Sequence, residues 1–240
     1  MKKALTYSFC IFFVSVFLLL NLREPLLGRN WDADVSVLAS VQSDGNIFTI
    51  RNARDWTYGP NTVLEQKYFD SNYRFEDLQG MSFYVQPLDY TGLIAHTFVV
   101  FHFNNSYGQY SDLGISIETR RERGEKYSLL GGLFNKFELT HTWATEQDLV
   151  ERRTKFYDYE VFPHDVTIPK NQQIEVLKEF LKQTDKLRSE PVFYNTALKN
   201  CTNALAQYIN QIAPKSIPWH YSFVFTGRSD DYLRSLGYIK

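Results

Sequence analysis

The strongest strand pattern in the chain is LIAHTFVVFHF, residues 93–103, where β-branched and aromatic residues follow one another between Gly92 and Asn104. Such residues favour extended backbone, whereas glycine and asparagine favour turns. A second strand pattern covers residues 113–120, and the intervening NNSYG, residues 104–108, is typical of a turn. We therefore predict that the two segments pair as an antiparallel hairpin.

Further strand and helix patterns lie on both sides of this hairpin. Residues 25–44 are predicted to form a linker and lead-in. The other predicted elements are strands at 46–51, 137–145 and 157–162, a short helix at 146–153, and helices at 171–187, 202–212 and 229–236. The chain has 19 Phe and 16 Tyr, and this aromatic content favours strands over a helical bundle. We expect an α+β fold.

The charge balance excludes one class of partner. The 240 residues carry 26 basic and 27 acidic side chains, a formal net charge of -1. Nucleic-acid-binding proteins need a basic surface to neutralise phosphates, so nucleic acid is not expected as a partner. The length suits one sizeable core, and we predict a single folded domain over residues 25–240.

An uncharged, apolar run, Ala4–Leu20, follows Lys2 and Lys3 at the N-terminus. Its length lies between that of a signal-peptide core and that of a full membrane span, and both imply export. No small-residue cleavage site follows it, so residues 1–24 are predicted to be a retained membrane anchor rather than a cleaved signal segment. The basic N-terminus would then be cytoplasmic, and the main domain would face the periplasm or the cell exterior.

Cys201 is the only cysteine outside this apolar run, so the domain offers it no disulfide partner. It sits between Asn200, a suitable helix cap, and Thr202 at the start of a predicted helix. Helix N-termini lower thiol pKa values, and their free amides can stabilise an oxyanion. The alternative is an inert cysteine buried in the apolar stripe of the helix.

A nucleophilic cysteine needs a base, and His96 is the candidate because it interrupts the apolar strand. The alternative is a core histidine with a polar partner. His102 shares its strand face but lies roughly 20 Å away in extended chain, too far to share a metal ion. No other cluster has metal-ligand spacing, so neither a metal nor another cofactor is predicted.

The neighbouring strand supplies an acid that could orient the imidazole. Antiparallel counting across the hairpin puts His96 opposite a residue between 116 and 120, within reach of Glu118 or Ser116. Either could complete a triad with Cys201, although Glu118 could equally be a surface residue paired with an arginine. Residues 118–126 alternate in charge, and most runs of this kind are solvated loops. Arg120 could instead bind a phosphate or carboxylate of the substrate. Tyr194 could wall the pocket.

An ordered set of segments resembles the Lnb N-terminal periplasmic domain over about residues 31–240. The segments are RNARDWTY (51–58), AHTF (95–98), SIETR (116–120), GEKYS (124–128), GLF (132–134), ATEQD (144–148), FYNTALKNCT (193–202) and GRSDDYL (227–233). The resemblance implies a circularly permuted papain-like fold, similar to lecithin:retinol acyltransferases and NlpC-type hydrolases, with an antiparallel sheet packed against helices.

The resemblance also implies a function. It makes His96 the base, Cys201 the nucleophile and Glu118 the third residue of a lipoprotein N-acyltransferase-like enzyme. The cysteine would take an acyl chain from a phospholipid as a thioester and pass it to the amino group of a lipoprotein. Two alternatives remain: a cell-wall peptide hydrolase of the NlpC type, and a non-catalytic envelope binding module in which Cys201 belongs to the core.

Overall fold

The computed structural model describes residues 7–8, 11–12, 14–16, 23–104, 110–213 and 215–240. Most of the predicted anchor, residues 1–24, and most of the predicted turn, residues 104–108, lie outside this set. Within the described ranges, no helix is both long and apolar enough to cross a membrane.

Most strands lie in the first two thirds of the chain, and the two longest helices follow them. The strands are β1 (Ser40–Asp44), β2 (Ile47–Arg54), β3 (Thr57–Gly59), β4 (Thr62–Glu65), β5 (Tyr68–Arg74), β6 (Leu78–Pro87), β7 (Ala95–Phe103), β8 (Asp112–Arg120), β9 (Glu138–Ala144) and β10 (Phe162–Asp165). The helices are α2 (Ala33–Ser36), η1 (Phe75–Asp77), α3 (Leu129–Leu133), α4 (Glu146–Glu151), η2 (Arg152–Phe156), α5 (Lys170–Ser189), α6 (Cys201–Ile212), η3 (Tyr221–Phe223), η4 (Thr226–Arg228) and α7 (Ser229–Ser235).

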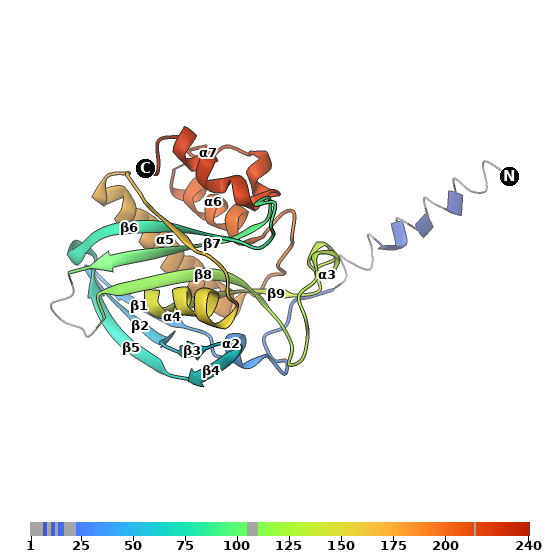
Figure 1. The fold of residues 1–240 in the computed structure, drawn as a ribbon, viewed down its shortest axis with the longest axis horizontal. Coiled ribbons are helices and arrows are strands. Elements are labelled where there is room, and N and C mark those ends of the chain that lie inside the picture. The colour runs from blue at the N-terminus through green and yellow to red at the C-terminus, as the bar shows by residue number, and fades with distance from the viewer. Residues whose placement is uncertain (1–6, 9–10, 13, 17–22, 105–109, 214) are drawn as a thin grey trace.

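An eight-stranded sheet forms the centre of the molecule, in the order β1-β2-β9-β8-β7-β6-β10, with β5 also paired to β2. All of its pairings are antiparallel except the contact of β2 with β9. The predicted hairpin is confirmed, because β7 and β8 pair from His102↔Asp112 to Phe98↔Ser116. The α+β class is therefore confirmed: a mostly antiparallel mixed sheet packs against several helices (Figure 1).

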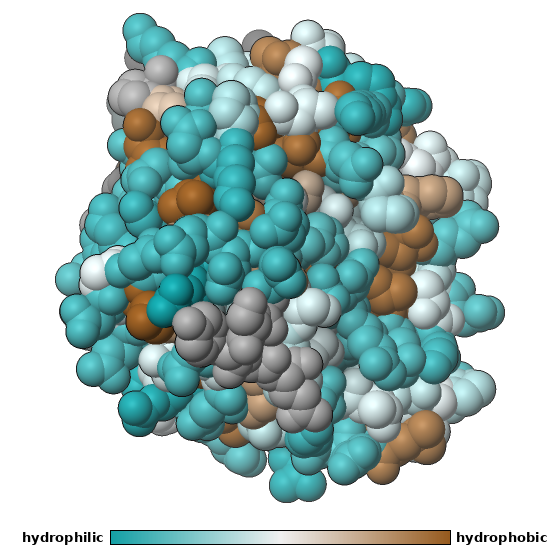
Figure 2. Space-filling view, turned by 90° about the vertical axis from the view of Figure 1, so that its left-hand side faces the viewer, coloured by the Kyte–Doolittle hydropathy of each residue, from teal (hydrophilic) through white to brown (hydrophobic). Residues whose placement is uncertain are grey.

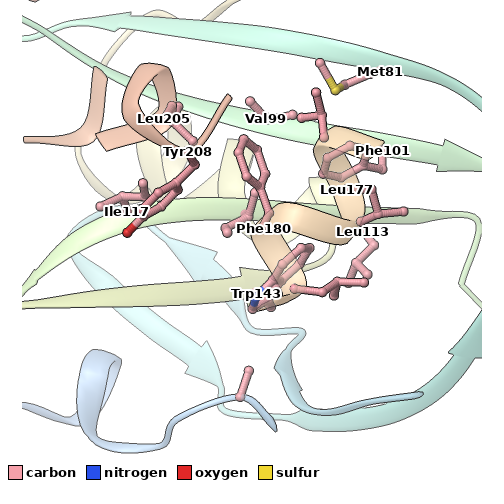
Figure 3. Packing of buried hydrophobic residues seen from close by; sticks show 14 of the residues in the cluster. Met81, Val99, Phe101, Leu113, Ile117, Trp143, Leu177, Phe180, Leu205 and Tyr208 are labelled. Carbon is pink, nitrogen blue, oxygen red and sulfur yellow. The ribbon is translucent and has the colours of Figure 1, made fainter. Parts of the chain in front are cut away.

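Helices cover both faces of the sheet. On one face, α5 and α6 bury a large core that includes Phe101, Trp143, Phe180 and Tyr208 (Figure 3). On the other face, α4 packs Leu149 against a smaller cluster from β6, β7 and β9. Because side chains alternate along a strand, successive residues of β7 enter these two cores in turn. Apolar side chains therefore cover both faces of the sheet at β7 and β8.

Three sequence expectations need correction. The segment 25–44 is not only a linker, because it contains α2 and β1. The strand expected at 157–162 begins at Phe162 instead; Asp158 adopts a positive φ of 57°, which is incompatible with extended chain. The short helix expected at 146–153 continues as a π-helical turn to Phe156.

Candidate functional site

The sheet splits between β7 and β8 at one end. Their pairing stops at Phe98↔Ser116, whereas β7 continues along β6 to Ala95 and β8 continues along β9 to Arg120. The backbone of His96 therefore pairs with β6 and has no pairing with β8. A split of this kind lets a side chain from one face of the sheet meet one from the other face.

Helix α6 begins at this split, with Cys201 as its first residue. Asn200 caps the helix: its side-chain oxygen accepts from the amides of Thr202 (3.0 Å) and Asn203 (2.9 Å), and the Asn203 side chain accepts from the Asn200 amide. The amides of Thr202 and Asn203 therefore already have an acceptor. The sequence expectation of helix amides open to an oxyanion therefore does not hold for these two.

Cys201 carries a free thiol, is 4% exposed and interacts with His96. Burial by itself would raise the pKa of the thiol. The charge of His96 and hydrogen bonds from His96 and Thr97 outweigh burial and lower the pKa to about 7. Near neutral pH a substantial fraction of Cys201 is therefore thiolate, the nucleophilic form.

The pKa of His96 moves in the opposite direction. Burial favours the neutral imidazole, but the negative charges of Glu118 and of the Cys201 thiolate raise the pKa of His96 to about 9. Burial would also raise the pKa of Glu118, yet His96 and Arg153 hold it well below the usual value of a glutamate. Between about pH 7 and pH 9 the site therefore holds a thiolate, an imidazolium and a carboxylate together.

Glu118 and Ser116 act on the same nitrogen of His96. The Nε2 atom lies 2.7 Å from Ser116 Oγ and 3.4 Å from Glu118 Oε1, and Ser116 donates to Glu118 over 2.7 Å. The buried guanidinium of Arg153 donates to both, at 3.0 Å and 2.9 Å. The structure thus brings together both candidates for the third residue, with an arginine that the sequence reasoning missed.

The hydrogen-bond directions indicate which imidazole nitrogen faces the thiol. Ser116 has one proton, which it gives to Glu118, so its oxygen accepts from Arg153 and from His96 Nε2–H. In the neutral imidazole a proton on Nε2 leaves Nδ1 as the acceptor. Nδ1 is then the atom available to exchange a proton with Cys201.

Thr97 and Thr202 line the other side of the thiol. Their hydroxyl oxygens are 3.1 Å apart, and Thr202 Oγ1 lies 3.9 Å from Cys201 Sγ. Thr97 also hydrogen-bonds to Cys201 through its backbone and its side chain, which helps lower the thiol pKa. Thr97 alternates with His96 along β7, so the two adjacent residues approach the sulfur from opposite faces of the strand.

The remaining sequence candidates have different positions. Tyr194 is buried close to Cys201, and burial together with the nearby thiol raises its pKa well above the usual tyrosine value. Asn200, besides capping the helix, donates to the carbonyls of Phe223 (2.7 Å) and Thr196 (2.9 Å). We call Cys201, His96, Glu118, Ser116 and Arg153 the cluster. Arg120 lies outside it, because its buried guanidinium donates to the carbonyls of residues 35 and 36.

The other four histidines have their own partners. His102 contacts Ser82 and Asp112, His141 contacts Thr184 and Tyr208, His164 contacts Asp230 and Arg234, and His220 contacts Ser222. Among the described residues, one set with metal-ligand chemistry has its ligand atoms within 4.8 Å of one another: His102, Asp112 and Glu146. It lies at the other end of β7 from Cys201 and includes no residue of the cluster. The expected absence of a metal stays a prediction.

Two contributors, Arg153 and Thr97, carried no signal in the sequence. Arg153 is 35 residues from Glu118, and its approach depends on how α4 and the π-helical turn after it pack on the sheet. Thr97 lies on the opposite face of β7 from His96, and only the split between β7 and β8 makes both available to one sulfur. The π-helical turn itself is a feature often found at functional sites.

The comparisons with known proteins give one result. A family model described as the Lnb N-terminal periplasmic domain matches residues 65–227, which is more than half of the 240 residues. The matched range includes His96, Glu118, Arg153 and Cys201. No curated protein and no solved structure matches the chain.

Proposed function

Because the chain belongs to the Lnb N-terminal periplasmic domain family, we propose that it is a thiol acyltransferase that acts on lipid or lipoprotein acyl groups at the bacterial inner membrane. Cys201 is the nucleophile, His96 the base and acid, and Glu118 with Ser116 the group that orients His96. The order of a strand histidine followed by a cysteine at a helix start also supports our proposal of a circularly permuted papain-like fold.

One observation carries this proposal: the buried thiol at the start of α6 interacts with His96, which Ser116, Glu118 and Arg153 hold in place, and this arrangement lowers the thiol pKa to about 7. A core cysteine without a charged partner would have a raised pKa, since burial disfavours the thiolate. Here His96 supplies the compensating charge, and Glu118 and Arg153 fix the position of His96. Such an arrangement is typical of an activated nucleophile with its base and a third orienting group.

In the first step the Cys201 thiolate attacks the ester carbonyl carbon of the donor lipid. A carbon–sulfur bond forms and the carbon–oxygen bond of the ester breaks. The His96 imidazolium gives its proton to the departing alcohol oxygen, which leaves as a lysophospholipid. The products are an acyl thioester on Cys201 and a neutral His96.

In the second step the amine of the acceptor attacks the thioester carbonyl. A carbon–nitrogen bond forms, the carbon–sulfur bond breaks, and the amine's proton goes to His96, which restores the thiolate and imidazolium. Water could replace the amine and release a free fatty acid. Burial of the cluster limits access of water, which favours transfer over hydrolysis.

A membrane-surface position is supported by exposed apolar side chains around the Cys201 end of the molecule. They lie on α3 and on the loops 88–94, 195–199 and 218–225, and we call them the apolar rim: Tyr90, Leu93, Leu129, Leu130, Leu198, Trp219, Tyr221 and Phe225. Hydrogen bonds join these segments to one another and to the cluster: Thr196 N–H to Gly132 O, Asn200 Nδ2 to Phe223 O, and Gly227 N–H to Leu93 O. Aromatic and aliphatic residues of this kind are typical of a surface that meets lipid.

Residues 23–26, which follow the N-terminal apolar run in the sequence, contact the folded part of the chain at this same end. Arg23 lies 5.6 Å from the ring of Phe193, next to Tyr194, and the amide of Leu26 donates to Glu138. An anchor at residues 1–24 would therefore hold the rim and the thiol close to the bilayer. Phospholipids and lipoproteins are accordingly the proposed substrates.

Purified full-length protein in vesicles of phospholipid with isotope-labelled acyl chains tests the function. We expect label on Cys201, removed by hydroxylamine as a thioester is, and no label on Cys201→Ala. His96→Gln should lose most of the labelling, whereas His102→Gln is the matched control, a histidine on the same strand face, and should label normally.

Two other results would redirect the proposal. Release of cleaved peptides from muropeptide substrates, without any labelling by lipid, would support the NlpC-type peptide hydrolase. A Cys201 thiol that reacts with iodoacetamide at pH 7.5 no faster than an unperturbed cysteine would contradict both enzymes and support a binding module, because an activated thiolate is readily alkylated.

A further inference from the structure

A cavity of about 520 Å³ lies between α5, α6, α7 and the sheet, beside the candidate nucleophile. Figure 3 shows four of its lining residues: Met81 from β6, Val99 from β7, Phe180 from α5 and Leu205 from α6. Its volume falls in the range of about 300–1,000 Å³ that small-molecule pockets occupy. The cavity is therefore large enough to hold a ligand rather than one or two water molecules.

The cavity reaches the Cys201 end through Thr202. Thr202 belongs to the lining, and its hydroxyl lies 3.9 Å from Cys201 Sγ. Ser222 and Phe223, in the loop that Asn200 holds, line the cavity as well. A group bonded to the sulfur could therefore extend past Thr202 into this space.

The lining is mainly apolar, which indicates what the cavity would bind. Of the charged side chains, Glu175 alone lines it among the described residues, and Glu175 is half-exposed and paired with Lys178. A phosphate would lack a cationic partner there, and the polar side chains of the lining, among them Asn171, Gln172, Ser222 and Ser229, are outnumbered by apolar ones. An unbranched hydrocarbon chain would bury its surface without losing any hydrogen bond.

The length of the cavity fits one acyl chain. The lining residues of α6 run from Thr202 through Leu205, Ala206 and Ile209 to Ile212, the last residue of the helix. At about 1.5 Å of rise per residue this stretch covers about 15 Å. The hydrocarbon core of a bilayer is about 30 Å thick, so one acyl chain of one leaflet spans about 15 Å.

We propose that this cavity is the acyl-chain site of the enzyme: it holds the hydrocarbon tail of one phospholipid acyl group while the carbonyl carbon is bonded to Cys201. The inference rests on the proposed function and adds to it a preference for long, unbranched acyl chains. A peptide or muropeptide carries more polar groups than the few polar side chains of this lining could pair. The head of the donor lipid would remain outside, at the apolar rim.

Chain-length selectivity tests the acyl-chain site. Thioester formation on Cys201 is measured by intact-protein mass spectrometry, with full-length protein and phospholipid donors whose acyl chains have six or sixteen carbons. Ala206→Phe places a ring in the cavity and should slow the sixteen-carbon donor about tenfold or more, with little effect on the six-carbon donor. Gln211→Phe adds the same ring to an exposed position of α6 and should change neither rate.

The outcomes separate this inference from the proposed function. If wild-type Cys201 is acylated and Ala206→Phe and Gln211→Phe show the same dependence on chain length, the acyl-chain site is wrong and the acyltransferase stands. If no donor acylates wild-type Cys201, the proposed function fails and the site assignment fails with it. Circular dichroism and thermal unfolding check that Ala206→Phe remains folded.

Binding gives a second readout that does not depend on the substituted cavity. A fluorescent sixteen-carbon fatty acid should bind Cys201→Ser protein saturably, one molecule per chain, and palmitate should displace it while hexanoate does not. Absence of saturable binding would overturn the acyl-chain site even if Ala206→Phe fails to fold.

Discussion

At the scale of single residues, the cluster around Cys201 is an example of charge compensating for burial. The sulfur, the imidazole of His96 and the carboxylate of Glu118 alternate in charge, so each stabilises the ionised form of its neighbour. Arg153 adds a fourth charge, paired with the same oxygen of Glu118 that faces His96. We attribute the reactivity expected of Cys201 to this chain of pairs rather than to the amides of Thr202 and Asn203, which already donate to Asn200.

The thiol pKa makes a prediction about pH. Below pH 7 Cys201 takes up a proton and loses its nucleophilic form, so its alkylation by iodoacetamide should rise with pH with a midpoint near 7, below the value of about 8.5 for a free cysteine. Acyl transfer should rise through the same pH and fall again near pH 9, where His96 loses the proton that the leaving group needs. Rates measured from pH 5 to pH 10 would show both the rise near pH 7 and the fall near pH 9.

The variant Glu118→Gln tests whether Glu118 contributes to the low pKa of the Cys201 thiol. Without the carboxylate the pKa of His96 falls and the thiolate loses part of its support, so the alkylation midpoint should move up by about one pH unit. Glu146→Gln, a glutamate beside Tyr84 and away from the cluster, should leave the midpoint unchanged. An unchanged midpoint in Glu118→Gln would mean that Glu118 has no electrostatic role at the site.

At the scale of elements, two of the ordered sequence motifs have a structural explanation. Arg54, from RNARDWTY, forms a buried ion pair with Asp148, from ATEQD, over 2.6 Å. Asp148 also accepts from the amide of Trp56 and the hydroxyl of Tyr58. These motifs hold β2 and the β3 hairpin against α4, the helix that continues into the turn carrying Arg153. They therefore support the site without belonging to it.

The cap of α6 makes an element-scale prediction. Asn200→Ala removes the cap and both ties to the neighbouring loops, and should lower the free energy of unfolding by about 1–2 kcal/mol. Asn200→Asp keeps the accepting oxygen of the cap but loses the donors to Phe223 and Thr196, so it should recover part of the stability. Urea unfolding of both variants measures the difference.

A second readout separates the roles of Asn200. In Asn200→Asp the new negative charge beside Cys201 should raise the thiol pKa, which Asn200→Ala should not do to the same extent. Gln207→Ala, which removes one exposed hydrogen bond on the same helix, is the control. If Asn200→Ala unfolds at the same urea concentration as Gln207→Ala, the cap contributes no stability.

At the scale of the whole molecule, polar and apolar surfaces separate along the strands. Figure 2 views the end where β7 finishes and β8 begins, and most of that face is hydrophilic with scattered apolar side chains. The apolar rim lies at the opposite end of these strands, around Cys201. This polarity fits a domain that stands on a membrane with its thiol toward the lipid.

Trp219 provides a direct test of that orientation. Of the four tryptophans, Trp219 is 76% exposed, whereas Trp31, Trp56 and Trp143 are buried. Full-length protein reconstituted with brominated phospholipids should therefore show partial quenching of its tryptophan fluorescence, and Trp219→Phe should remove the quenchable part. Equal fluorescence in brominated and ordinary lipid would contradict contact between the rim and the bilayer.

Local patterns in the sequence were sufficient for the β7–β8 hairpin, for α5, α6 and α7, and for bringing His96 within reach of Glu118, because strand alternation and helix periodicity depend on near neighbours. Strands β3 to β6 were not predicted, and neither were Arg153, Thr97 or the cavity. Their positions depend on contacts between segments distant in the chain: α4 packs Arg153 against β8, and the split between β7 and β8 admits Cys201 from the other face. The sequence alone was thus enough to propose Cys201, His96 and Glu118 as candidates and to place them on a helix start and two neighbouring strands. The charge network and the space beside the thiol, by contrast, exist only where segments distant in the chain meet.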